Sequence, residues 1–120
     1  MTEPAHQWRI DLRARLIAAR KSKDSVSTAA IRSALSAIDN AETPDVPLPR
    51  AGAIADSAHG LGAAEVARRC LTEDQIRELI RAEADERRAA AEHLRSAGHD
   101  DRAEQVQAEA AVLRQLLGTD

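Results

Sequence analysis

Aromatic residues are almost absent from this sequence, which has one tryptophan and neither phenylalanine nor tyrosine. This scarcity excludes a β-sandwich or barrel built on aromatic side chains. It also excludes a nucleic-acid platform that stacks bases on such side chains. A single cysteine excludes a disulfide framework. Because no apolar stretch follows Met1, we expect neither a secretion signal nor a membrane helix, and a cytoplasmic location.

The residues that are present favour helices. The 120 residues suit one domain, and alanine supplies about half of the hydrophobic residues, which make up 43% of the chain. Charged residues make up 31%, and most are glutamate, aspartate or arginine. This composition predicts an all-α fold. The net charge of −3 predicts only modest long-range attraction to nucleic acid.

Apolar residues recur at helical spacing in four segments, which predicts four main helices in a single domain of residues 1–120. The predicted helices cover residues 7–23, 26–41, 73–97 and 101–117. Closely spaced prolines and glycines predict a long loop over 43–71, in which residues 63–69 can form one short helix.

Helix boundaries are marked by residues that cap helices. Thr72 with Gln75 predicts a capping box, and Gly98 suits a left-handed residue after the third helix. The short turn at Gly98 predicts that the last two helices form a long antiparallel hairpin. Asp24 or Ser25 is expected to cap the second helix and Asp100 or Asp101 the fourth.

Residues suited to catalysis or metal binding do not form a recognisable pattern. Cys70 follows two arginines that could lower its pKa, but no base is linked to it in sequence. His93 and His99 are six residues apart across Gly98, which does not fit a zinc site. No glycine loop of a phosphate-binding type is present. We therefore expect no enzymatic activity, no cofactor and no metal.

Two helices carry rows of basic side chains. On the first helix one narrow sector is basic, and it is the candidate face for a nucleic acid or a protein partner: Arg9, Arg13, Arg20 and Lys23. The alternative for this row is a solvated face with ion pairs. The row on the third helix is Arg77, Arg81, Arg88 and Arg95. There Glu78, Asp85 and Glu92 each precede an arginine by three residues, which favours ion pairs at the surface.

Charged residues also fall on faces that are otherwise apolar. On the third helix the predicted buried side is Ile76, Leu79, Ile80, Ala90, Ala91 and Leu94, and Glu83 and Arg87 project into it. The full predicted polar cluster is Arg32, Glu42, Glu83, Arg87 and Glu109. Because buried charges must be paired, we expect a Glu83–Arg87 pair, extended by Arg32 or Glu42, that fixes the hairpin on the second helix. A ligand site is the less favoured alternative.

The first helix has more apolar residues than one contact requires. Leu12 and Leu16 lie on one side of it and Ile10 and Ile17 on another. A second packing surface or a partner could cover the excess. This pattern supports an alternative function, a protein-binding or self-associating module without a role in nucleic-acid binding.

The sequence resembles the GatB/YqeY family in two blocks that cover about two thirds of the chain. The first block carries Leu12, Leu16, Ala19, Lys21, Lys23-Asp24, Ile31-Arg32, Leu35, Ala37-Ile38, Asn40 and Glu42. The second carries Leu71-Thr72-Glu73, Glu83, Arg87, Ala97-Gly98, Ala103-Glu104, Ala108-Glu109, Val112-Leu113 and Leu117.

The resemblance implies an all-helical domain with a long hairpin. The family includes the C-terminal region of the B subunit of the tRNA-dependent amidotransferase, a carbon–nitrogen ligase that uses glutamine as amide donor. In that enzyme the tail touches tRNA, while the chemistry occurs in other domains and subunits. The resemblance thus implies a non-catalytic module that binds tRNA or a translation-linked protein. We expect the chain to lack the small C-terminal helical subdomain that the family usually carries.

Overall fold

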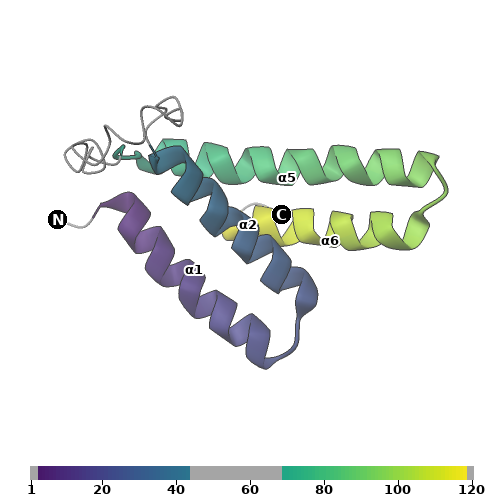
Figure 1. Cartoon of the computed structure of the whole chain (residues 1–120), viewed down its shortest axis with the longest axis horizontal. Coiled ribbons are helices and arrows are strands. Elements are labelled where there is room, and N and C mark those ends of the chain that lie inside the picture. Colours follow the sequence, from purple (N-terminus) through teal and green to yellow (C-terminus); the bar gives the residue numbers. More distant parts are fainter. Residues whose placement is uncertain (1–2, 44–68, 119–120) are drawn as a thin grey trace, which may run out of the picture.

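The computed structural model describes residues 3–43 and 69–118, and this part of the chain is all-helical. The helices are α1 (Pro4–Lys21), α2 (Ser25–Glu42), α5 (Glu73–Ser96) and α6 (Asp100–Leu116). Figure 1 shows two antiparallel pairs: α1 lies beside α2, and α5 lies beside α6. The α2 helix packs on both helices of the second pair. The predicted all-α fold and hairpin are confirmed. Of the short helix expected at 63–69, all but Arg69 lies outside the described residues, and Arg69 is not helical.

The α1 helix begins and ends earlier than the predicted 7–23. Pro4 occupies the start of the helix, where a missing N–H costs nothing because no helical carbonyl precedes it. The C-terminal end lies at Lys21, and Lys23 adopts a left-handed backbone with φ of 59°. This residue turns the chain, so that α2 runs back along α1.

Capping interactions define the other helix ends. The Asp24 carboxylate accepts a hydrogen bond from the Ser27 N–H at 3.0 Å. The Thr72 hydroxyl accepts from the Gln75 N–H at 3.1 Å, and the Gln75 side chain accepts from the Thr72 N–H at 2.9 Å. Gly98 has a φ of 84°, as predicted.

The N-cap residue of α6 is His99, which makes no side-chain cap bond, rather than Asp100 or Asp101. Both aspartates lie in the first turn, where they favour the positive helix end.

The main core lies where α2 crosses the α5–α6 pair. Its largest fully buried side chains are Leu12, Ile38, Ile76, Ile80 and Leu113, which come from all four helices. The apolar residues that recur at helical spacing in α2 and α6 are buried, except that Leu35 is partly buried at the edge. They are Ile31, Ala34 and Ile38 in the α2 stripe and Ala103, Val106, Ala110, Leu113 and Leu117 in the α6 stripe.

The tip of the hairpin has a separate, smaller core of Ala91, Ala103 and Val106, with Leu94 partly buried. Ala90 is exposed, contrary to the prediction. Only α6 covers α5 at the tip, as Figure 1 shows. A single covering helix buries only part of the predicted apolar side of α5 there, because no second helix packs beside it.

Candidate nucleic-acid interface

The turn between α1 and α2 brings basic side chains from three segments together. Arg20 comes from the last turn of α1, Lys23 from the connecting turn and Arg32 from the middle of α2. All three line one open hollow of about 450 Å³, together with Ser25, Thr28 and Ala29. None of the described residues that line this hollow is acidic. Sequence spacing placed Arg20 and Lys23 on one face, but Arg32 joins them only because α2 folds back along α1.

Arg13 extends this basic region along α1. It is exposed and lies seven residues before Arg20, which places the two on the same face of the helix. Within residues 3–43 and 69–118, none of Arg13, Arg20, Lys23 and Arg32 forms an ion pair. We call these four residues the cationic surface.

Arg9, the fourth residue of the predicted basic row, has a different role. Its guanidinium donates to Asp39 Oδ1 at 2.6 Å and to Glu42 Oε1. Only 15% of the Arg9 side chain and 9% of the Glu42 side chain are exposed. The hydrogen bond to Glu42, followed by that to Asp39, raises the pKa of Arg9 above its ordinary value despite the opposing effect of burial. Arg9 therefore joins α1 to α2 and is not available as part of an open basic face.

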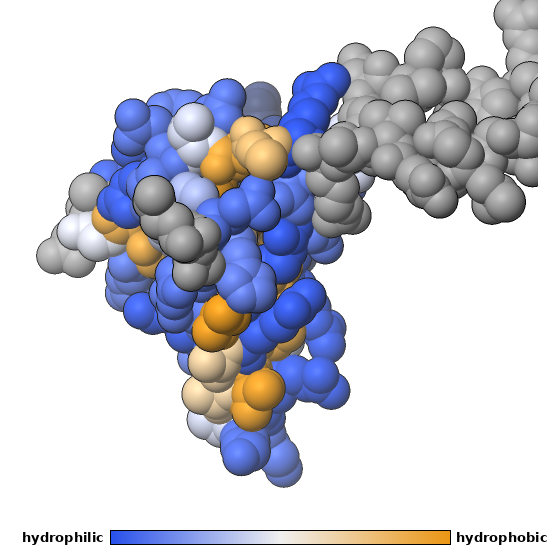
Figure 2. All heavy atoms as spheres, turned by 90° about the vertical axis from the view of Figure 1, so that its left-hand side faces the viewer, coloured by the Kyte–Doolittle hydropathy of each residue, from blue (hydrophilic) through white to orange (hydrophobic). Residues whose placement is uncertain are grey.

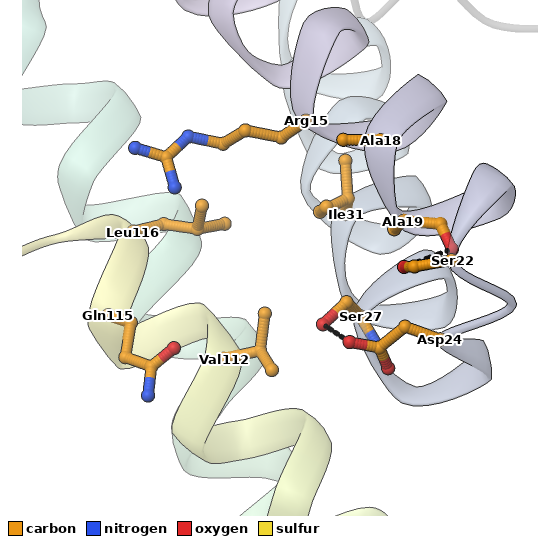
Figure 3. A pocket seen from close by; sticks show the side chains of 10 residues that line it. All are labelled: Arg15, Ala18, Ala19, Ser22, Asp24, Ser27, Ile31, Val112, Gln115 and Leu116. Atoms are coloured by element: carbon orange, nitrogen blue, oxygen red, sulfur yellow. Dashed lines mark hydrogen bonds between the residues drawn. The ribbon is translucent and has the colours of Figure 1, made fainter.

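Asp24 forms no ion pair with the adjacent Lys23. Its two carboxylate oxygens accept from the N–H and the hydroxyl of Ser27, at 3.0 and 2.7 Å. These hydrogen bonds, the backbone one first, lower the pKa of Asp24. Figure 3 shows Asp24 on a second hollow between the α1–α2 pair and the end of α6. The carboxylate is thus engaged in capping α2.

This second hollow has a volume of about 300 Å³ and is lined by both polar and apolar side chains. Ala18, Ile31, Val112 and Leu116 supply the apolar side chains, and Arg15 points across it in Figure 3. It holds Arg15 and Asp24 as its charged groups. This mixture of small apolar and opposite charged side chains does not define a ligand chemistry.

The predicted Glu83–Arg87 pair is present, with 3.1 Å between Arg87 Nη1 and Glu83 Oε1. Arg87 Nε also lies 3.1 Å from Oε1 of Glu109, a side chain that is only 10% exposed. Its Nη2 donates to the hydroxyl of Ser33 on α2. One arginine thus links α5 to both α6 and α2.

The predicted extension of this cluster by Arg32 or Glu42 is not observed. Glu42 bonds to Arg9, and Arg32 lines the hollow at the other end of α2. Ser33 and Asp39 were not predicted from the sequence. Their polar side chains complete two clusters, one around Arg87 with Ser33 and one around Arg9 with Asp39. Their positions beside the apolar stripe of α2 were visible in the sequence, but a serine or aspartate there is also typical of an exposed helix face.

Three of the four arginines in the basic row on α5 are paired. Arg81 lies 2.7 Å from Glu78 and Arg95 lies 3.8 Å from Glu92, which confirms two of the expected surface pairs. The third expected pair, Asp85 with Arg88, is not formed among the described residues. Arg77 lies 3.5 Å from Glu73 and also donates to the carbonyl of Leu117. We therefore place the candidate interface on the cationic surface and not on the hairpin.

Two other features bear on function. The exposed Cys70 thiol donates to Glu3 Oε1 at 3.0 Å, and this carboxylate raises the pKa of the thiol. Such a thiol is less nucleophilic than an ordinary one at neutral pH.

Among the described residues no group of three metal-binding side chains comes together, and no helix there could span a membrane.

Comparisons with known proteins add no family or fold relationship. The sequence matches no family model, and the comparisons with curated proteins and with solved structures found no match.

Proposed function

We propose that this chain is a non-catalytic helical module of the GatB/YqeY type that binds tRNA through the cationic surface. The observation that carries the proposal is the grouping of Arg20, Lys23 and Arg32 around one hollow whose described lining residues include no acid. These cations form no ion pair within the part of the chain that the structure describes, and such a local excess of positive charge in a protein of net charge −3 is a suitable site for phosphate groups.

The composition restricts how the RNA would be recognised. Without phenylalanine or tyrosine, the chain cannot stack several unpaired bases on aromatic rings. Arginine and lysine side chains would instead contact the phosphate backbone, which gives affinity with little sequence preference. In this proposal, amide transfer to a tRNA-bound amino acid takes place in other chains, and the module holds the tRNA.

The test is tRNA binding to the purified chain over a series of salt concentrations. Affinity should fall steeply as salt rises because counterions are released from the RNA. Replacing Arg13, Arg20, Lys23 and Arg32 by alanine should weaken binding strongly and flatten the salt dependence, by about one unit of slope per lost phosphate contact. Arg9 is left intact because its loss would disturb the contact between α1 and α2.

A matched control removes cations that are already paired. The Arg81→Ala/Arg95→Ala variant loses two exposed arginines of the hairpin and should bind tRNA nearly as the unaltered chain does. No binding at low salt, or equal losses in both variants, would overturn the proposal.

A second candidate function is protein binding or self-association through the outer face of α1. Ile10 and Ile17 are 48% and 56% exposed, and they are two turns apart on the same side of the helix. Figure 2, which views the molecule from the side of α1 in Figure 1, shows hydrophobic patches among mainly hydrophilic residues. Light scattering at increasing protein concentration tests self-association. A chain that stays monomeric at high concentration would contradict self-association through this face.

A further inference from the structure

The hollow at the α1–α2 turn offers hydrogen-bond donors for a compact anion. Its three cations come from different backbone segments, and all three line the same open hollow. Two arginine forks and one ammonium group offer more donors than the two oxygens of a carboxylate can accept. A tetrahedral phosphate has further oxygens to accept them. The volume of about 450 Å³ leaves room for a phosphate group with accompanying water.

The turn backbone contributes to this arrangement. Lys23 is held in a left-handed conformation, and its N–H donates to the Arg20 carbonyl at 3.1 Å. The next N–H, of Asp24, donates to the Ala19 carbonyl at 2.9 Å. The Thr28 hydroxyl donates to the carbonyl of Asp24 at 2.8 Å, so its oxygen also ties the turn to α2. The backbone positions of Arg20 and Lys23 are therefore set by a hydrogen-bonded turn.

We propose that this hollow binds one phosphate group, held by Arg20, Lys23 and Arg32. The inference rests on the proposed function and deepens it, because it names the group of the ligand that is bound and the residues that bind it. Arg13 lies two helical turns away, about 10 Å along α1. It is too far to share this phosphate and would contact another one on the same RNA.

The same chemistry can come from two sources, an internal phosphodiester of an RNA strand or a terminal phosphate monoester. The terminal group carries more negative charge and has more free oxygens. Two otherwise identical short RNA oligonucleotides, one with and one without a 5′-phosphate, separate these sources. Equal affinities assign the hollow to the internal phosphodiester, and affinity confined to the phosphorylated oligonucleotide assigns it to the terminal phosphate.

The direct test is titration of the full chain with inorganic phosphate, followed by the backbone amide signals in NMR. Signals of residues 20–32 should shift and saturate, at constant ionic strength maintained with sodium chloride. Arg32→Gln should weaken phosphate binding about tenfold, since it removes one charged fork while keeping a polar side chain. Arg81→Gln, on the hairpin, should leave it unchanged. Chemical-shift changes that do not saturate with phosphate, or that chloride alone reproduces, would contradict the proposed phosphate site.

The outcomes also separate this inference from the proposed function. Saturable phosphate binding without affinity for tRNA contradicts the tRNA-binding proposal and supports the hollow as a phosphate site. Affinity for tRNA that Arg32→Gln leaves unchanged, together with no saturable phosphate binding, contradicts the hollow and supports the broader surface.

Discussion

Arg87 on α5 and Glu109 on α6 form an ion pair in which Nε and Oε1 are 3.1 Å apart and both side chains are largely shielded from water. The same guanidinium bonds to Glu83 and to Ser33, so this arginine holds the hairpin together and attaches it to α2. The pair therefore fixes the relative positions of three helices.

Arg87→Ala should lower the free energy of unfolding by about 2–3 kcal/mol, because it leaves the carboxylate of Glu109 shielded without its partner. Arg81→Ala removes an arginine from an exposed pair and should cost about 0.5 kcal/mol or less. Urea denaturation of both variants measures the difference. Equal, small losses would contradict a structural role for Arg87.

The two polar clusters should be energetically separate. A double-mutant cycle between Arg87 and Glu109 should give a coupling energy above about 0.5 kcal/mol, because the residues are in contact. A cycle between Arg87 and Glu42 should give little coupling, since Glu42 bonds to Arg9. Strong coupling in the second cycle would instead support the single extended cluster expected from the sequence.

The two apolar sides of α1 should differ in their contribution to stability. Leu12 is 1% exposed, so Leu12→Ala should cost about 3 kcal/mol. Ile17, which is 56% exposed, should tolerate Ile17→Ala with a loss of about 0.5 kcal/mol or less. Thermal or urea unfolding of the monomeric chain tests this. A large loss for Ile17→Ala that depends on protein concentration would favour self-association through this face.

The thiol of Cys70 should react slowly at mildly alkaline pH. The neighbouring carboxylate of Glu3 raises its pKa, which lowers the fraction of reactive thiolate. Glu3→Gln should lower that pKa and speed alkylation by iodoacetamide at pH 8, with the two rates converging when both thiols are fully ionised. A pH profile that the substitution leaves unchanged would contradict the contact.

The cap of α2 should weaken in acid. The pKa of Asp24 is lower in the folded chain than in the unfolded one, since Ser27 donates to its charged form. Its stabilising effect is therefore present above the unfolded pKa and is lost as the pH falls through the folded value. NMR titration should give a midpoint for Asp24 below that of an ordinary aspartate. Ser27→Ala should raise this midpoint, and an unchanged midpoint would contradict the hydroxyl contact.

Local patterns in the sequence determined much of the fold. Apolar spacing set the buried faces of α2 and α6, and the capping residues Thr72 and Gly98 set the ends of α5, because these depend on interactions within a few residues. The Glu83–Arg87 pair was predictable for the same reason, since its members are one turn apart. The presence of basic side chains near the α1–α2 turn was also evident.

Tertiary structure decided which charges meet across helices. Arg9 looked equivalent to Arg13 and Arg20 in the sequence, but the antiparallel packing of α2 placed Asp39 and Glu42 against it. The same packing brought Arg32 to Arg20 and Lys23. The packing of α5 against α6 placed Glu109, and not Glu42, beside Arg87. Periodicity identifies the side of a helix on which a residue lies, whereas the axial register between two packed helices depends on how their side chains fit together.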